Sequence, residues 1–417
     1  MANYINAYAN QAQYDADDTK QYPNVSLLRD SGTIVHVKEA PKPYLTFVAE
    51  EAGTFKFSGK SVNYSVDDGT TWSTLASNTD SPTVPVGGKI MFKATLIPNY
   101  GNGIGRFSST GRFTAKGNPM CLLFGDDFED KTSLNGKHDA FNKLFSNCTG
   151  LTSAENMSLQ ATTLAESCYH SMFSGCTSLT TVPALPATTL ASFCYTQMFN
   201  GCTSLTTAPV LSATTLAQNC YMNMFSGCTS LTTAPALPAT TLANTCYYGM
   251  FDGCTSLTTA PELQATTLKS GCYNSMFYGC TSLTTAPVLP ATTLANDCYN
   301  SMFLNCTALT TAPVLSATTL ANDCYRMMFQ NCTSLINAPE LPATTLTDNC
   351  YYQMFYGCRN LNSITCLATD ISASNCTYRW AYSVASTGTF TKDPSMSSWT
   401  TDYNGIPTNW TVQDYQA

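Results

Sequence analysis

Short runs in which apolar and polar residues alternate fill residues 44–125. Examples are YLTFVA, GTFKFSG, VNYSV, TWSTL and KIMFKATLI, and Asp68-Gly69 stands between two of these runs. A period of two predicts strands with one buried face, and Asp-Gly between such strands predicts a tight hairpin turn. This segment is therefore predicted to form a small antiparallel β-sandwich.

A longer period begins at Cys168, where the block CYHSMFSGCTSLTTVPALPATTLASF is followed by further copies of the same 26-residue length. One series of cysteines recurs at this interval from Cys168 to Cys376, and a second runs from Cys176 to Cys358, eight positions behind the first. Repeat positions are counted here from the first cysteine of each block. Repetition without gaps predicts a solenoid in which each block forms one turn.

Within a block, CYxxMFxGC holds aromatic residues three to four apart and stops at Gly or Asn, which predicts a short helical corner. The segments CTSLTTAP and PATTLA are β-branched and broken by proline, which predicts short extended pieces. One block cannot fold alone, because ordering each residue costs about 1–2 kcal/mol and each buried apolar side chain contributes only about 1.5–3 kcal/mol. We therefore expect a mainly β solenoid of about nine stacked turns with short helical corners, on the order of 40 Å long.

The segments on either side of the regular blocks differ in character. Residues 1–43 are polar and are predicted to be an N-terminal attachment segment. Residues 126–167 hold an irregular first repeat that caps the solenoid, whose regular turns occupy 168–367. Residues 368–417 are predicted to be a C-terminal cap whose tryptophans cover the open end of the core.

Charge is scarce along the whole chain. Only 11% of residues are charged, the net charge is −8, and Lys and Arg form no cluster. This composition argues against a nucleic-acid partner, and no apolar stretch is long enough to cross a membrane. The first thirty residues lack the apolar core of a secretory signal, so we expect a protein made in a cytosol without such a signal.

Twenty cysteines raise three possibilities: disulfides, zinc sites, or free thiols packed in the core. The spacings of 8 and 18 lack the CxxC pairs and companion histidines of structural zinc sites. A buried free cysteine behaves as a small apolar group, and one that recurs once per turn stacks on its own copies. We predict two ladders of free thiols and no bound metal, with a disulfide scaffold as the alternative. The first ladder members are Cys168, Cys176, Cys194, Cys202, Cys220 and Cys228.

The pattern MFxGCTSLTTAPxLPATTLAxxCYxxMF resembles the BspA-like class of leucine-rich repeats over roughly residues 141–376. The combination F-x-x-C-x-x-L with a following L-P carries this resemblance, although Thr-Ala-Pro replaces the usual β-branched apolar residue. The resemblance implies a surface adhesin or binding scaffold. The opening MANYINAYANQAQYDADDTKQYPNVSLL resembles the start of phage virion proteins, including head fibres of crAss-like phages, and that second resemblance implies a virion protein.

No catalytic constellation emerges from the sequence. His36, His138 and His170 lie in three different segments. Glu262 and Glu340 share one repeat position three turns apart, about 14 Å by strand spacing, which is too far for the carboxylate pair of a glycosidase. The glycines of GNGIG are interpreted as a turn, because no helix pattern follows them. We predict a protein that is not an enzyme and has no cofactor.

Residues at repeat positions three, four and seven vary from block to block. Helical spacing would bring them together on the outside of the corner, where aromatic and basic side chains stack on sugar rings or dock a protein. The candidate binding residues are Tyr248, Tyr278, Arg326, Tyr352 and Tyr356. The alternative is that variation marks solvent exposure alone. The tyrosine at position two is predicted to lie in the core.

The resemblance to virion proteins, together with the missing export signal, implies a non-enzymatic phage virion structural protein: a head or capsid fibre, or a related decoration or tail fibre. The N-terminal segment would attach to a capsid or tail protein, and the rod would adhere to host or mucosal glycans. We expect assembly in the host cytoplasm, location in the virion, no membrane contact, and a homo-oligomer with a trimer as the default. The alternative is a bacterial cell-surface BspA-like adhesin.

Overall fold

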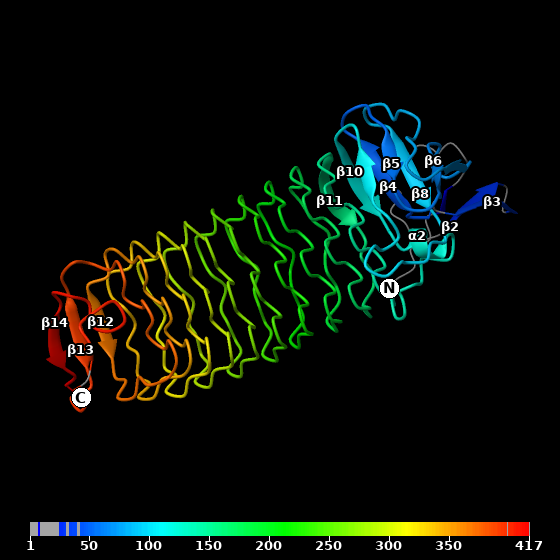
Figure 1. Cartoon of the computed structure of the whole chain (residues 1–417). Helices are drawn as coiled ribbons and strands as arrows, with labels where there is room; N and C mark the ends of the chain where they lie inside the picture. The colour runs from blue at the N-terminus through cyan, green and yellow to red at the C-terminus, as the bar shows by residue number, and fades with distance from the viewer. Residues whose placement is uncertain (1–6, 9–24, 31–32, 40–41, 398, 417) are drawn as a thin grey trace.

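A computed structural model describes residues 7–8, 25–30, 33–39, 42–397 and 399–416. The fold is mainly β, and α2 (Cys121–Phe124) is the one α-helix within these ranges. Figure 1 shows the N-terminal sheets at one end and a single row of stacked repeats leading to the C-terminal strands at the other. In the part of the chain that is described, no helix has the length and apolar character to cross a membrane.

A small sheet lies inside the segment 1–43, where no strand was predicted. It consists of β1 (Ala7–Tyr8), β2 (Val25–Asp30) and β3 (Thr33–Glu39). Strand β2 pairs in parallel with β1 and antiparallel with β3. The rest of the predicted attachment segment up to residue 41 lies outside the described residues.

The next part of the chain forms one six-stranded sheet with the order β11-β10-β4-β8-β6-β7. Its strands are β4 (Leu45–Ala49), β6 (Val62–Ser65), β7 (Ser73–Leu75), β8 (Lys89–Lys93), β10 (Phe113–Gly117) and β11 (Leu151–Met157). A two-stranded ribbon of β5 (Phe55–Phe57) and β9 (Phe107–Ser109) packs on it, since the Phe47 ring lies 5.2 Å from Phe55 and 4.9 Å from Phe107.

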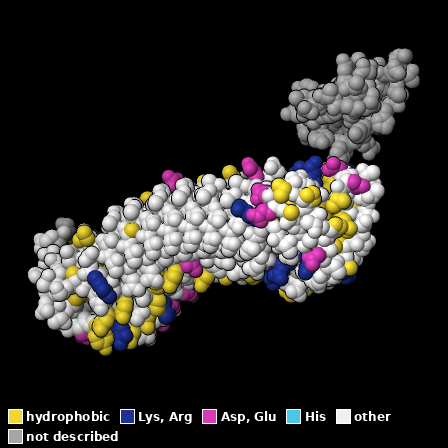
Figure 2. All heavy atoms as spheres, turned by 90° about the horizontal axis from the view of Figure 1, so that it is seen from above, with side chains coloured by type: hydrophobic (Ala, Val, Ile, Leu, Met, Phe, Trp, Pro, Cys, Tyr) yellow, Lys and Arg dark blue, Asp and Glu magenta, His cyan; other side chains and the backbone are white. Residues whose placement is uncertain are grey.

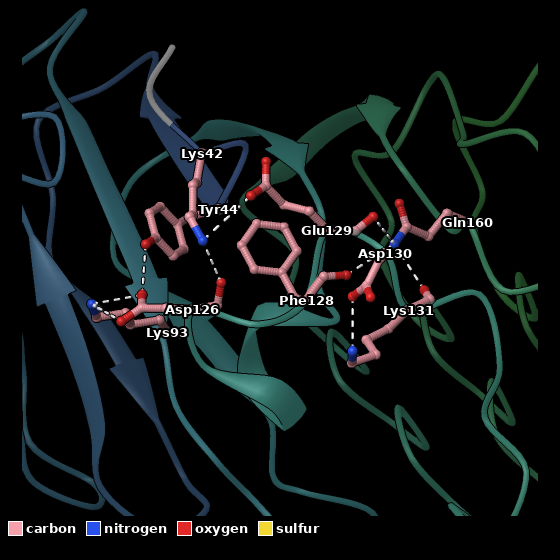
Figure 3. Close-up of polar contacts among 9 residues, drawn as sticks. All are labelled: Lys42, Tyr44, Lys93, Asp126, Phe128, Glu129, Asp130, Lys131 and Gln160. Atoms are coloured by element: carbon pink, nitrogen blue, oxygen red, sulfur yellow. Dashed lines mark hydrogen bonds and ion pairs between the residues drawn. The ribbon is translucent and has the colours of Figure 1, made fainter. Parts of the chain in front are cut away.

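The antiparallel sandwich is therefore not confirmed. Strand β11 comes from the irregular first repeat and pairs in parallel with β10, so the sheet continues from the N-terminal part into the solenoid. The alternating runs predict strands but do not reveal this long-range partner, which occupies the free edge of β10. Within the irregular first repeat, Figure 3 shows the Gln160 side-chain amide donating to the main-chain carbonyls of Phe128 at 3.1 Å and Lys131 at 2.8 Å.

The corner at repeat positions one to eight is not helical, and that prediction is wrong. Its amides alternate between two kinds of acceptor: Met172 N donates to Tyr169 O within the turn at 3.2 Å, and Phe173 N donates to Met198 O of the next turn at 2.9 Å. A helix needs each amide to bond four residues back. The corners instead form a ladder that joins each turn to its neighbour.

Left-handed backbone at three points per turn gives this corner its shape. In the first regular block these points are Ser167 (φ 56°), Ser171 (φ 52°) and Gly175 (φ 74°). The same three positions recur with positive φ in the following turns, although most of their residues are not glycine. Left-handed residues cannot continue a right-handed helix, so the corner is a chain of tight turns.

Aromatic side chains stack along the interior of the solenoid. Tyrosines at position two lie 5.7–6.2 Å from one another between ring centres, and phenylalanines at position six lie 5.5–5.8 Å apart. The phenylalanine stack begins at Phe145, whose ring lies 5.8 Å from Phe107 in the N-terminal sheets. The position-two tyrosines are buried, as predicted.

Repeat geometry continues beyond residue 367 into the predicted cap. Strands β12 (Ser363–Cys366), β13 (Thr389–Lys392) and β14 (Thr411–Asp414) pair in parallel, like successive turns. Phe355 N donates to Trp380 O at 2.7 Å in the same ladder. The Trp380 ring is buried, stacks on Trp399 at 5.7 Å and donates from Nε1 to Gly405 O at 2.8 Å.

Candidate functional site

Aromatic and basic side chains gather on the outside of the corners near the C-terminal end of the solenoid. Figure 2 shows hydrophobic and basic side chains side by side near that end, whereas the visible face of the middle of the rod carries few of either. We call this group the aromatic–arginine cluster. Its members are Arg326, Tyr352, Tyr356, Tyr378, Arg379, Tyr382 and Tyr403.

One column of the cluster runs along repeat position three. The Arg326 guanidinium lies 4.6 Å from the centre of the Tyr352 ring and donates to Asp323 Oδ1 at 3.1 Å. The Tyr352 ring in turn stacks on Tyr378 of the next turn at 5.0 Å. Each cation–π contact at an exposed site contributes about 0.5–1 kcal/mol. These contacts therefore order the column.

The second column runs along position seven and meets the first at Arg379. The Tyr356 and Tyr382 rings stack at 5.4 Å. The Arg379 guanidinium lies 5.4 Å from the Tyr378 ring and 5.8 Å from the rings of Tyr382 and Tyr403. Tyr382 and Tyr403 are 43% and 48% exposed. No carboxylate of the described residues forms an ion pair with Arg379, so its charge is available to a ligand.

A groove of about 460 Å³ lies beside the second column and is lined by Tyr382, Asp402 and Tyr403 among others. Asp402 Oδ1 accepts the main-chain N–H groups of Asn404 at 2.7 Å and Gly405 at 2.9 Å, which hold this carboxylate in place. Exposed tyrosine rings present flat apolar faces, and the neighbouring polar groups bind hydroxyls. The groove therefore combines apolar ring faces with hydrogen-bonding groups.

Three of the five predicted binding residues, Arg326, Tyr352 and Tyr356, lie in the cluster. Tyr248 and Tyr278 occupy the same two columns but lie three 26-residue repeats closer to the N-terminus. Tyr278 is 37% exposed, and its hydroxyl accepts from Asn305 Nδ2 at 3.3 Å. The structure therefore divides the five predicted binding residues into three that belong to the cluster and two tyrosines that lie apart from it.

Four members of the cluster were missed by the sequence reasoning, because the segment after residue 367 was assigned to a cap. The register of Cys376 with the first cysteine series was the available signal. It places Tyr378, Arg379 and Tyr382 at positions three, four and seven of a further turn. Tyr403 had no such signal, because the sequence around it does not match the block.

The cysteine ladders lie inside the solenoid. All twenty cysteines are buried and free, including the predicted ladder members Cys168, Cys176, Cys194, Cys202, Cys220 and Cys228. Position-nine thiols donate to the preceding turn; for example, Cys202 Sγ donates to Phe173 O at 3.2 Å. Burial raises the pKa of Cys168 to about 12. Throughout the described ranges, no three His, Cys, Asp or Glu side chains are grouped so as to hold a metal ion.

A second polar group lies where the N-terminal sheets meet the first repeat (Figure 3). Asp126 Oδ1 accepts from Lys93 Nζ at 2.8 Å and Tyr44 Oη at 2.6 Å, and these hydrogen bonds lower the pKa of Asp126. Lys42 pairs with Glu129 at 3.3 Å in the same region. These contacts pair opposite charges and occupy the carboxylate of Asp126, so their role is to fasten the two parts together.

A family model for the BspA type leucine-rich repeat region, with six copies, matches residues 138–258, 221–336 and 272–383. Together these matches cover more than half of the chain. The chain belongs to the BspA-type leucine-rich-repeat family. This family is a non-enzymatic repeat fold of the adhesin type, and the BspA-like resemblance predicted from the repeat pattern is confirmed. Comparisons with curated proteins and with solved structures found no match.

Membership in the BspA-type family accounts for the constant positions of the block. These positions form the stacked core, so side chains that could contact a ligand lie at the variable positions and the ends. In this BspA-type chain the variable positions carry most of the aromatic–arginine cluster.

Proposed function

We propose that this BspA-type repeat protein is a non-enzymatic adhesion protein whose aromatic–arginine cluster binds saccharides on a host or mucosal surface. The observation that carries the proposal is the convergence of five tyrosines and two arginines on the outside of the last turns. Exposed tyrosines stack on the apolar faces of sugar rings, and Arg379 adds hydrogen-bond donors. The direct test is a screen of the labelled protein on an array of immobilised glycans, and adhesion predicts binding to a defined subset.

We propose further that the protein is a phage virion component: a head or capsid fibre, or a related decoration or tail fibre. Two points support this role. The opening of the sequence resembles virion proteins, and the N-terminal sheets and the cluster lie at opposite ends of the rod (Figure 1). Attachment to a capsid or tail protein through the N-terminal segment would present the cluster outwards. A homotrimer would multiply weak saccharide contacts through avidity.

Mass and peptide analysis of purified virions tests the virion role. The proposal predicts that peptides of this chain are present in virions at several copies each, and that native mass measurement of the purified protein gives a trimer. Absence from virions, with the protein recovered in the outer-membrane fraction of uninfected cells, would contradict the proposal. That result would support the alternative, a bacterial cell-surface BspA-like adhesin.

A further inference from the structure

A basic cleft lies at the opposite end of the rod from the aromatic–arginine cluster. Its volume is about 440 Å³, and it opens where the N-terminal sheets meet the irregular first repeat. Lys60, Arg106 and Lys143 line it, and none of its lining residues is Asp or Glu. This cleft takes no part in the proposed adhesion through the cluster.

The cleft contrasts with the rest of the molecule. The chain has a net charge of −8, yet three cations converge here. Within the described part of the chain, none of the three forms an ion pair with a carboxylate. Like charges held in one cleft repel one another, and a bound anion relieves that repulsion. The charge pattern therefore points to an anionic ligand.

Backbone packing shows that the cleft is pre-formed. A Cβ on Gly105 would lie 2.5 Å from Gly59 Cα, and one on Gly103 would lie 2.6 Å from Asn142 O. Only glycine permits such close approach, so the turn at residues 101–105 is wedged between the loop at Gly59 and the first repeat. Lys143 Nζ donates to Gly101 O at 3.4 Å, which holds one cation beside this turn.

One buried acidic residue, Asp139, contacts the turn beside the cleft. Asp139 is 4% exposed, and its carboxylate accepts from Gly101 N at 3.0 Å and from Asn142 Nδ2 at 2.8 Å. The Asp139 carboxylate holds the turn through its hydrogen bond to Gly101 and does not line the cleft. The turn is not the start of a helix, in agreement with the sequence analysis, so side chains and not a helix end supply the positive charge.

We propose that this cleft binds the sulfate or phosphate ester of a saccharide. The three cations hold the oxyanion by charge-assisted hydrogen bonds. Asn99 and Asn102, which also line the cleft, supply amides for the sugar hydroxyls, and Ile97, 70% exposed, supplies an apolar contact. The volume exceeds what a free oxyanion needs and falls within the usual range of small-ligand sites.

Calorimetric titration of the full chain tests the proposal with four probes: galactose sulfate ester, galactose phosphate ester, unesterified galactose and inorganic sulfate. The cleft variant is Lys60→Gln/Arg106→Gln/Lys143→Gln. The matched control, Lys116→Gln/Lys269→Gln/Arg359→Gln, removes the same charge from exposed positions outside the cleft. At least one ester should bind more tightly than the other two probes. The cleft variant should lose at least about tenfold in affinity for it, and the control less than about twofold.

Three results would overturn the proposal: no ester binding, equal losses in the two variants, or affinity for unesterified galactose equal to that for the esters. Inorganic sulfate binding as tightly as the sulfate ester would overturn the assignment of a saccharide. The thermal unfolding midpoint is measured for each variant, and Lys143→Gln alone replaces the triple variant if the latter unfolds early. The basic cleft and the aromatic–arginine cluster share no residue. A failure of ester binding in the cleft can therefore be distinguished from a failure of the proposed adhesion through the cluster.

Discussion

Burial decides the chemistry of the cysteine side chains. The pKa of Cys306 and that of Cys358 are raised to about 12, because a thiolate inside the solenoid would lose its hydration. A nucleophile or metal ligand needs the thiolate form. These thiols therefore remain protonated at neutral pH and act as small packing groups, which is consistent with their position in two ladders beside the aromatic stacks.

This burial predicts alkaline destabilisation. Because the folded pKa of about 12 lies above the ordinary 9.0, the folded state holds more protons than the unfolded state between these values. The stabilising effect is complete below about pH 9 and is lost as pH rises towards about 12. The free energy of unfolding in urea should fall from about pH 9 upwards. A free energy that stays constant or rises over this range would contradict the burial of the ladders.

Thiol counting is the control for that experiment. Complete denaturation without reductant should release all twenty cysteines as free thiols, whereas the native protein should react slowly because every thiol is buried. Fewer than about sixteen free thiols after denaturation would indicate disulfides and remove the basis of the alkaline prediction.

At the scale of the element, a chain of tight turns forms the corner for which the sequence predicted a short helix. Each corner sends alternate amides to the next turn, so its hydrogen bonds join turns as a strand ladder does. Positions four and eight and the residue before each block are left-handed, and most of these residues carry side chains. A left-handed conformation costs about 1–2 kcal/mol for a residue with a Cβ. The inter-turn hydrogen bonds and the buried stacks offset this cost.

Replacement of Gln353 by glycine distinguishes a corner built from tight turns from a helical corner. Gln353 is at position four with φ 51°, so Gln353→Gly should raise the free energy of unfolding by up to about 1 kcal/mol. In a helix the same change would lower it by about 1 kcal/mol. Ser226→Gly, at a position without positive φ, is the matched control and should be destabilising. A lower free energy of unfolding for Gln353→Gly in urea titrations would contradict a corner built from tight turns.

The stacking of repeats could be predicted from the sequence, but the backbone conformation of the corner could not. The 26-residue period places Tyr, Phe and Cys once per turn, which is enough to predict buried columns. Aromatic residues four apart fit a helix and a chain of turns equally well. The left-handed positions hold residues such as Gln353 and Met327, which give no glycine signal. The edge pairing of β10 with β11 likewise depends on a contact between segments far apart in the chain.

At the scale of the whole molecule, a uniform rod separates two distinct ends. The phenylalanine stack runs from Phe145 to Phe355 in steps of 5.5–5.8 Å, which together span on the order of 45 Å. Among the repeats, position four holds a cation at Lys143, in the first turn of this stack, and at Arg379, in the turn that follows Phe355, and at no repeat between them. Each of these cations belongs to one of the two sites proposed here. The middle of the rod acts as a spacer.

Part of the cluster could be predicted, because Arg326, Tyr352 and Tyr356 stand at variable positions of regular blocks. For Tyr378, Arg379 and Tyr382 the register of Cys376 is the one signal, because Trp380 and its neighbours replace the usual core residues and hide the continuing turn. Tyr403 could not be predicted, because the sequence around it does not match the block. The basic cleft was beyond the reach of the sequence, because Lys60, Arg106 and Lys143 come from separate segments joined only in the fold.

Adhesion through the aromatic–arginine cluster is tested most directly by saccharide binding on a glycan array. Arg379→Gln/Tyr382→Ala removes the shared arginine and an exposed ring without touching the buried stack. Val288→Ala, at a residue 78% exposed in the middle of the rod, is the control. We predict that the unaltered protein and the control bind the same subset of glycans, and that the double variant, with an unchanged unfolding midpoint, loses at least about tenfold in affinity. Equal binding by all three proteins, or no binding by any, would contradict the account.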